Sequence, residues 1–241
     1  MPPKKQKKDD IQTDGKIVNL YEKIPKELLT KADNPNKHLH NLDLPFRMCI
    51  VAPSGTGKTN FLVNLLTLFS AGKGSFQSIH IITANADEPL YNWLKQKSNG
   101  QIVIKEGVRN TPPLDKFDKE LNHLVVWDDL VLAKDLSAVE TMYLRGRKMG
   151  VSCVFIAQSY FKIPKMIRNN CNYMVLLKLS GNREVSVILS EFGLGVSKEE
   201  LLKIYDYATD TKFSPLLIDM TSSPKERFRK GMLEIIDVNE L

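Results

Sequence analysis

The sequence predicts an α/β fold in which helices flank a mainly parallel sheet, and three observations carry that prediction. Short apolar runs alternate along the chain with stretches of helical periodicity, as strand–helix–strand units do. Most of these runs are continuously apolar, which is typical of strands that are covered on both faces. A glycine-rich loop stands between the first run and the first helical stretch, where α/β proteins commonly bind phosphate groups.

The predicted elements follow one another in a regular order. Strands are predicted at Met48–Ala52, Ile79–Thr83, Ile102–Ile104, Leu124–Trp127, Val151–Ala157 and Tyr173–Leu177. Helices are predicted at Lys58–Phe69, Leu90–Lys97, Ser137–Lys148 and Arg183–Phe192. This alternation indicates βαβ units, which build parallel sheets.

The C-terminal part contains a helix with a clear start signal. Ser197 is in the N-cap position and Glu200 follows three residues later, so the pair predicts a capping box and a helix to about Tyr207. Two short strands, Leu216–Asp219 and Met232–Ile236, are expected to close the sheet.

The N-terminal residues differ in composition from the rest of the chain. Residues 1–17 have no periodic apolar face, and four of the first eight residues are lysines, so we expect a disordered basic tail. Three interpretations of that lysine cluster are open: a solvated tail, an arm that binds phosphates, or a localisation signal. Residues 18–241 are expected to form a single domain, with a short helix over Pro25–Lys31, a core at 44–192, and the C-terminal helix and strands at 193–241.

The composition restricts the class of protein. Of the 241 residues, 42% are hydrophobic and 26% are charged, which suits a globular domain with a real core. The longest apolar runs are of strand length, short of the ~20 residues that a membrane helix needs, and no signal peptide is visible, so no membrane partner is expected. The three cysteines lack metal-ligand spacing, which predicts reduced thiols. The net charge of +6 permits an anionic partner without requiring one.

The strongest motif is the phosphate loop of P-loop NTPases. It comprises Ala52, Pro53, Ser54, Gly55, Thr56, Gly57, Lys58 and Thr59, with alanine in place of the first glycine. Gly55 and Gly57 let the backbone turn tightly, so that its N–H groups point at the phosphates. Lys58 would contact the β- and γ-phosphates, and the Thr59 hydroxyl would be a ligand of Mg²⁺. A predicted strand before the loop and a predicted helix after it supply the context that the motif requires.

A second motif, Asp128 and Asp129, follows the apolar run Leu124–Trp127. Asp128 would hold the Mg²⁺ shell, and Asp129 would polarise the attacking water as a general base. An aspartate pair after a strand is often only a turn or a helix cap, but the phosphate loop earlier in the chain favours the functional interpretation. The sequence has no Asn-Lys-x-Asp guanine signature, so ATP is the expected nucleotide.

A polar residue also follows the next predicted strand, Val151–Ala157. Gln158 stands at its carboxyl end, where an added-strand P-loop ATPase places a side chain that senses the γ-phosphate or orients the water. A single glutamine after a strand is usually without function. The preceding Asp128–Asp129 strand makes the sensor the favoured interpretation.

Arginines near this strand are candidates for a finger that stabilises charge on the transferred phosphoryl group of a neighbouring subunit. Arg145 and Arg147 precede the strand, and Arg168 follows it in the segment Ile163–Asn170. The alternative for each arginine is an ordinary solvated surface charge.

Taken together, these motifs resemble the FtsK/HerA superfamily of DNA-pumping ATPases, over about residues 44–192. The chain is most similar to the poxvirus-type genome-packaging ATPases of large double-stranded DNA viruses and their smaller relatives. The resemblance rests on the order and spacing of the phosphate loop, Asp128-Asp129, Gly146-Arg147-Lys148, Gln158 and Pro164…Arg168. Asp129 departs from the glutamate of many superfamily members, which leaves the assignment of the base open.

The resemblance implies a RecA/FtsK-like, added-strand ATPase that uses ATP and Mg²⁺ to move double-stranded DNA into a capsid. It implies a ring of identical subunits, a pentamer or hexamer, that meets the capsid or portal vertex. Arg147 is the first choice for the trans finger and Arg145 the second. The place of action would be the host cytoplasm, at the site of virion assembly, or the virion itself.

Other functions remain open from the sequence. One is a helicase or a DNA-transfer ATPase of a mobile element, which shares the core motifs. Another is an ATP-binding capsid or scaffold protein with negligible turnover, against which Asp129 and Gln158 argue. A nucleoside-phosphate kinase would need an arginine-rich lid that is not evident. If the chain is a DNA pump, the lysines and arginines that grip phosphates are expected among Lys105, Arg109, Lys116 and Lys119, unless these are only solvated charges.

Overall fold

A computed structural model describes residues 17–25, 33–192, 195–237 and 241. The chain divides into two units, residues 1–31 and 32–241, and each is described by itself. In the first unit the described residues include the 3₁₀ turn η1 (Leu20–Lys23). Residues 1–16 of the predicted tail and most of the predicted helix Pro25–Lys31 lie outside the described residues. The second unit contains the sheet and starts at residue 32, whereas the sequence interpretation started the domain at residue 18.

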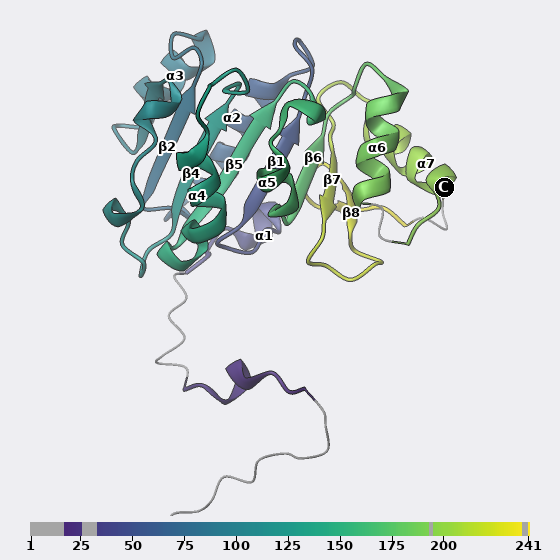
Figure 1. The fold of residues 1–241 in the computed structure, drawn as a ribbon, viewed down its shortest axis with the longest axis horizontal. Helices are drawn as coiled ribbons and strands as arrows, with labels where there is room; N and C mark the ends of the chain where they lie inside the picture. The colour runs from purple at the N-terminus through teal and green to yellow at the C-terminus, as the bar shows by residue number, and fades with distance from the viewer. Residues whose placement is uncertain (1–16, 26–32, 193–194, 238–240) are drawn as a thin grey trace, which may run out of the picture. The chain divides into compact units, whose positions relative to one another are not determined.

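The described residues of the second unit form one sheet in the order β3-β2-β4-β5-β1-β6-β7-β8-β9 (Figure 1). Its strands are β1 (Arg47–Val51), β2 (Ser78–Thr83), β3 (Ile102–Glu106), β4 (His123–Asp128), β5 (Val151–Ala157), β6 (Tyr173–Leu176), β7 (Leu216–Asp219), β8 (Phe228–Lys230) and β9 (Glu234–Ile235). The strands from β3 to β6 in this order are parallel, and β7, β8 and β9 are added antiparallel at one side. The predicted mainly parallel sheet is confirmed.

Helices cover both faces of the sheet, and each face has its own apolar cluster (Figure 1). One face carries α1 (Lys37–His40), α2 (Lys58–Phe69) and α3 (Pro89–Lys97), and the other carries α4 (Ser137–Arg145), α5 (Lys165–Asn169), α6 (Asn182–Phe192) and α7 (Lys198–Ala208). Successive strand side chains alternate between the clusters: Met48 and Ile50 of β1 pack with α2, whereas Cys49 and Val51 pack with α4. Burial on both sides explains why the strands read as continuous apolar runs.

Short 3₁₀ segments complete the connections between these elements. They are η3 (Val108–Asn110), η4 (Leu114–Lys116), η5 (Gly146–Met149) and η6 (Tyr160–Lys162). The predicted helix Ser137–Lys148 therefore ends as an α-helix at Arg145 and continues as 3₁₀ turns to Met149. The helices α1 and α5 were not predicted, because each is too short to show a helical period.

The C-terminal predictions have mixed outcomes. The capping box of α7 is confirmed, since the Ser197 hydroxyl accepts from the Glu200 N–H at 3.3 Å and the Glu200 carboxylate accepts from the Ser197 N–H at 3.0 Å. The predicted strand Met232–Ile236 is wrong in extent: Gly231 turns the chain at φ +65°, and only the pair Glu234–Ile235 is strand. The strand β8 was missed because Arg229, which is buried and ion-paired with Asp219, interrupts its apolar pattern.

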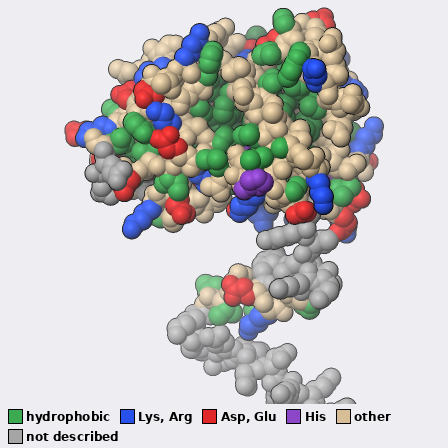
Figure 2. Space-filling model, turned by 180° about the vertical axis from the view of Figure 1, so that it is seen from behind, with side chains coloured by type: hydrophobic (Ala, Val, Ile, Leu, Met, Phe, Trp, Pro, Cys, Tyr) green, Lys and Arg blue, Asp and Glu red, His purple; other side chains and the backbone are tan. Residues whose placement is uncertain are grey.

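Surface charge and the cysteines are two further features of the described residues. On the face opposite to that of Figure 1, Lys and Arg side chains are interspersed with Asp and Glu rather than gathered (Figure 2). The three cysteines are free, with Cys49 and Cys153 buried. Over the part of the chain that the structure describes, no helix has the length and apolar character needed to cross a bilayer.

His40 is a buried titratable group that ties α1 to α2. Its Nδ1 accepts a hydrogen bond from the Leu42 N–H at 3.1 Å, and its ring meets Phe69 edge-on at 4.8 Å between centroids. Its Nε2 has no hydrogen-bond partner among the described residues. Burial, with smaller contributions from His38 and Lys37, lowers the pKa of His40 to about 4.

We therefore expect an acid-sensitive fold. The unfolded chain binds a proton at this position below pH ~6.5, whereas the folded chain does so only near the pKa of about 4. Stability is thus lost as the pH falls from 6.5 towards 4, by at most about 3 kcal/mol. Urea unfolding at pH 7.5 and pH 5 measures this loss. The variant His40→Asn should reduce the pH dependence and the exposed-site control His38→Asn should not; an unchanged dependence in His40→Asn would contradict the assignment.

Candidate active site

The phosphate loop connects β1 to α2 at the carboxyl edge of the sheet. Its start is fixed by the Ala52 N–H, which donates to the Ala157 carbonyl of β5 at 3.0 Å. Gly55 and Gly57 have φ values of +77° and +100°, in the left-handed region that favours glycine. Within the described parts of the chain, the N–H groups of Ser54, Gly55 and Gly57 donate no hydrogen bond. The loop therefore offers free donors at the start of a helix, which is the arrangement that binds phosphate.

Lys58, the first residue of α2, reaches two carboxylates. Its Nζ lies 3.3 Å from Oδ1 of Asp128 and 3.4 Å from Oδ2 of Asp129. The lysine side chain is 15% exposed and that of Asp128 is 3% exposed, so the attraction between them is little weakened by water. This pairing holds the ammonium beside the phosphate loop. Thr59 follows Lys58 and is buried at the start of α2.

Asp128, the last residue of β4, is fixed by a tyrosine that the sequence analysis did not single out. The hydroxyl of Tyr91, on α3, donates to Oδ2 of Asp128 at 2.6 Å. Burial and the nearby Asp128 carboxylate raise the pKa of Tyr91, so the tyrosine stays a donor. The other oxygen, Oδ1, is buried and lies 3.3 Å from the Lys58 ammonium, and it accepts no hydrogen bond among the described residues. A buried carboxylate oxygen that is balanced by a neighbouring cation is the kind of atom that a divalent cation can bind when that neighbour moves away.

Asp129 has a strained backbone that directs its side chain. Its φ is +58°, and its N–H donates to the Ile156 carbonyl of β5 at 3.1 Å. The Nε2 atom of Gln158 donates to Oδ2 of Asp129 at 2.6 Å. Asp129 is 29% exposed at its side chain, so water can reach it. The polar residues predicted after the two strands are thus direct neighbours.

The segment after Gln158 is held by charged groups of α5 and α6. Glu184 accepts from the Ser159 hydroxyl at 2.8 Å and from the Tyr160 N–H at 2.5 Å. The Tyr160 hydroxyl donates to Glu191, and the Arg168 guanidinium lies 4.4 Å from the centre of the Tyr160 ring. Arg168 is therefore engaged inside its own chain. The roles of Glu184 and Tyr91 leave no signal in the sequence, because each is an ordinary residue of a helix.

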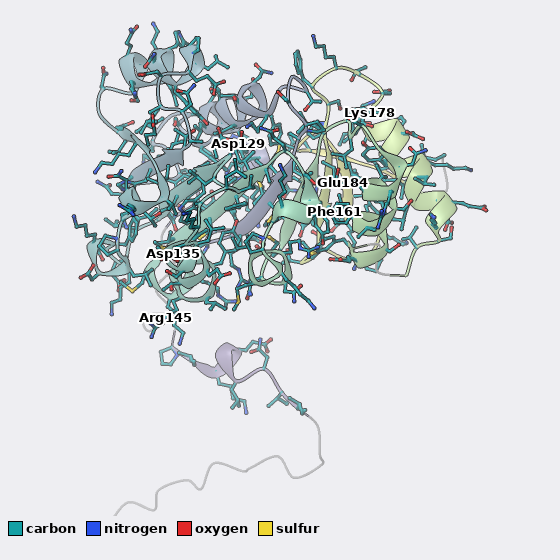
Figure 3. All side chains as sticks on the ribbon, turned by 45° about the horizontal axis from the view of Figure 1, so that its top comes forward. Asp129, Asp135, Arg145, Phe161, Lys178 and Glu184 are labelled. Carbon is teal, nitrogen blue, oxygen red and sulfur yellow. The ribbon has the colours of Figure 1, made fainter. Side chains whose placement is uncertain are left out.

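Arg145 and Arg147 lie elsewhere. Both are exposed, at the end of α4 and in η5, just before the amino end of β5. Figure 3 shows Arg145 and Asp129 near opposite ends of the strands. The seven residues of β5 separate the amino ends from the carboxyl ends of the strands, by about 23 Å at ~3.3 Å per residue. Neither arginine can reach the phosphate loop of its own chain.

The chain is similar in sequence to known viral proteins. A family model described as "Poxvirus A32 protein" matches residues 36–218. The DNA packaging protein OPG160 of monkeypox virus is 26% identical over 153 residues, which are 58% of this chain and 50% of that protein. The same protein of vaccinia virus (strain Copenhagen) is 26% identical over 153 residues, which are 58% of this chain and 55% of that protein. The chain spans about half the length of these curated relatives.

Solved structures share the fold. The genome packaging NTPase B204 from Sulfolobus turreted icosahedral virus 2, in complex with AMP, has a TM-score of 0.58 at 12% identity, over 80% of this chain and 100% of that one. Its complex with ATP-gammaS has a TM-score of 0.55 at 14% identity, over 81% and 100%. The cytoplasmic domain of the Type VII secretion ATPase EccC of Thermomonospora curvata has a TM-score of 0.53 at 13% identity, over 80% and 25%. At these identities the likeness establishes the P-loop ATPase fold alone.

The contact between Tyr91 and Asp128 gives a test of the site's construction. We expect Tyr91→Phe to lose ~1–3 kcal/mol of stability, because a buried carboxylate oxygen loses its donor. Urea unfolding of the protein without nucleotide measures the loss. The control is Tyr207→Phe, which removes the exposed hydrogen bond to Glu234 and should cost less than about 0.5 kcal/mol. Equal effects of the two variants would contradict the role given to Tyr91.

Proposed function

Because the chain belongs to the poxvirus A32 protein family, we propose that it is an ATP-hydrolysing motor that packages double-stranded viral DNA into a capsid. The observation that carries the proposal is the contact of Lys58 with both Asp128 and Asp129, beside a phosphate loop with free N–H donors. A phosphate-binding cation, a metal-binding carboxylate and a candidate base meet in one place. The arrangement suits hydrolysis better than nucleotide binding alone.

Binding of ATP would replace the ion pairs of Lys58. The ammonium would move from the two carboxylates to the β- and γ-phosphates. The free N–H groups of Ser54, Gly55 and Gly57 would donate to the phosphates. Thr59 and Oδ1 of Asp128, once Lys58 has moved away from that oxygen, would hold Mg²⁺. When bound, that ion neutralises charge on the phosphates. Its fit rests on the buried, acceptor-only oxygen of Asp128.

Hydrolysis would use the carboxylate that Lys58 releases. Asp129 would accept a proton from water as the water oxygen bonds to the γ-phosphorus and the bond from that phosphorus to the β–γ bridging oxygen breaks. Gln158 already donates to Asp129 at 2.6 Å, so it is suited to orient the water and to respond to the loss of the γ-phosphate. Glu184 holds the residues directly after Gln158, which would pass that response to α6.

The proposed substrate is DNA, which the name of the relatives includes, and its duplex form is part of the proposal. The candidate gripping residues are all exposed: Lys105 lies on β3, and Arg109, Lys116 and Lys119 lie between β3 and β4. Contacts of such side chains with phosphates would be independent of base sequence and sensitive to salt. A ring of five or six subunits at the capsid vertex, in the host cytoplasm or on the virion, is part of the same proposal.

The first experiment measures steady-state ATP hydrolysis with Mg²⁺, with and without duplex DNA. The wild type should hydrolyse ATP, faster with DNA, and Lys58→Ala should not bind the nucleotide. Asp129→Asn should bind ATP but lose ~10²–10⁴-fold in kcat, as expected for loss of a general base. The control Asp135→Asn changes an exposed aspartate of the loop that follows β4 (Figure 3). Full activity of Asp129→Asn would contradict the role of Asp129 as the general base. If the wild type does not hydrolyse ATP, the ATP-binding scaffold protein is the function that stands.

The second experiment tests an arginine finger in trans. Because Arg147 cannot reach the site of its own chain, Arg147→Ala should bind ATP almost normally and lose ~10³-fold or more in turnover. Mixed with Lys58→Ala subunits, it should regain part of the activity, since each variant supplies what the other lacks. The exposed neighbour Lys148→Ala is the control. No recovery in mixed assemblies, with intact assembly by mass measurement, would contradict the trans placement.

A further inference from the structure

The order of the strands fixes which way a bound nucleotide would run. Asp128, Asp129 and Gln158 follow β4 and β5, on one side of β1 and its phosphate loop. On the other side of β1 lies β6, followed by β7. A γ-phosphate that faces the carboxylates leaves the α-phosphate and the nucleoside to extend towards β6. The inference below therefore rests on the proposed function.

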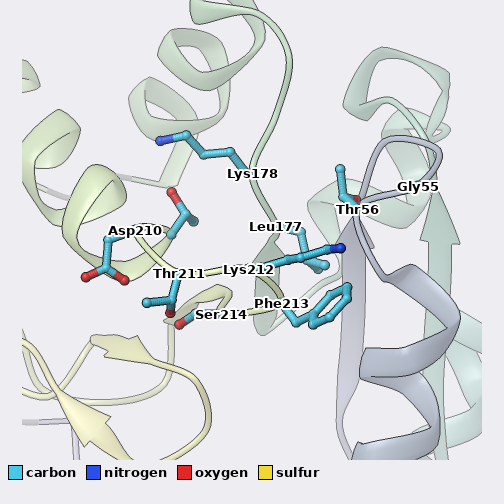
Figure 4. Close-up of a pocket in the computed structure, with 10 residues that line it drawn as sticks. Gly55, Thr56, Leu177, Lys178, Asp210, Thr211, Lys212, Phe213 and Ser214 are labelled. Carbon is cyan, nitrogen blue, oxygen red and sulfur yellow. The ribbon is translucent and has the colours of Figure 1, made fainter.

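A pocket of about 410 Å³ is present on that side. Gly55 and Thr56 of the phosphate loop form one wall, Leu177 and Lys178 at the end of β6 form another, and the loop Thr209–Ser214 forms the third (Figure 4). The volume is within the ~300–1,000 Å³ range of small-molecule sites. The pocket is thus continuous with the phosphate loop and lies where the nucleoside would extend.

Phe213 lies in this loop with an unusual backbone. Its φ is +71°, which is rare for a bulky side chain and marks stored strain. The ring packs directly on Gly57, so that a side chain at position 57 would collide with it. It is nevertheless 44% exposed, and Figure 4 shows it turned towards the phosphate loop. The strained residue therefore places its ring beside the phosphate loop, with the exposed Lys212 ammonium 4.9 Å from the ring centre.

The loop is held in place by contacts with α7 and β8 and by a contact within itself. The Thr209 hydroxyl donates to the Tyr205 carbonyl of α7 at 2.8 Å. Both carboxylate oxygens of Asp210 accept from Nζ of Lys230 on β8 at 2.9 Å. The Ser214 N–H donates to the Thr211 carbonyl at 3.2 Å. Anchors on α7 and β8 therefore support the loop that carries Phe213.

We propose that this pocket receives the base and ribose of the bound nucleotide, with the Phe213 ring as the aromatic contact surface. An aromatic ring suits the flat face of a base, and such contacts tolerate different bases. Thr211 and Ser214, whose side chains carry hydroxyl groups, also line the pocket. Phe213 is then a binding residue for the part of the nucleotide that takes no part in hydrolysis.

The test compares two probes on the full chain with Mg²⁺, by calorimetry. A non-hydrolysable ATP analogue tests the phosphate loop and the pocket together, whereas inorganic tripolyphosphate tests the phosphate loop alone. Phe213→Ala should lower the affinity for the analogue about tenfold or more. It should change the affinity for tripolyphosphate less than about twofold. Phe213→Trp, which keeps an aromatic face, should retain most of the affinity. Thr211→Trp, which fills the pocket, should lower the affinity for the analogue and leave the affinity for tripolyphosphate unchanged.

The outcomes separate this inference from the proposed function. Failure of the wild type to bind either probe would overturn both. If the wild type binds both probes and Phe213→Ala weakens both equally, the ring supports the phosphate loop and the base pocket is wrong. If Phe213→Ala and Thr211→Trp leave the affinity for the analogue unchanged, the base lies elsewhere and the inference is overturned while the proposed function stands.

Discussion

The ammonium of Lys58, between the carboxylates of Asp128 and Asp129, is the interaction on which the organisation of the site depends. It joins the phosphate loop after β1 to the acidic end of β4, although β5 lies between these two strands. The contact is possible because parallel strands bring their carboxyl ends to one edge of the sheet. In water such a pair would be weak; here Asp128 is almost fully buried, so the attraction is retained.

The neighbouring contacts follow from this arrangement. Tyr91 fixes one oxygen of Asp128, Lys58 faces the other, and Gln158 fixes Asp129. On the far side of β1 there is no comparable acidic cluster among the residues lining the described pocket, whose aspartate is already paired with Lys230. The two sides of the phosphate loop therefore differ in chemistry. One side carries the carboxylates and Gln158, suited to the reaction, and the other carries an aromatic ring, hydroxyl groups and two lysines, Lys178 and Lys212.

Much of the fold could be predicted because parallel strands and amphipathic helices leave strong patterns. The phosphate loop and the residues after β4 and β5 could be recognised since each has a fixed place relative to a strand. Tyr91, Glu184 and Phe213 could not, because their roles depend on which distant segments meet. The strand β8 was missed for a related reason: the charge of Arg229 is neutralised by Asp219 only in the folded chain. Arg145 and Arg147 could be identified from the sequence as candidates for the finger. Only the structure shows how far they lie from the site of their own chain.

The most direct test of this account is a crystal structure with Mg²⁺ and a non-hydrolysable ATP analogue. The account predicts that Nζ of Lys58 leaves both carboxylates and contacts the β- and γ-phosphates. It also predicts the γ-phosphate beside Asp129 and Gln158 and the base beside Phe213. An analogue bound away from the phosphate loop, or a Lys58 that stays paired with Asp128 and Asp129 while the analogue occupies the loop, would contradict it.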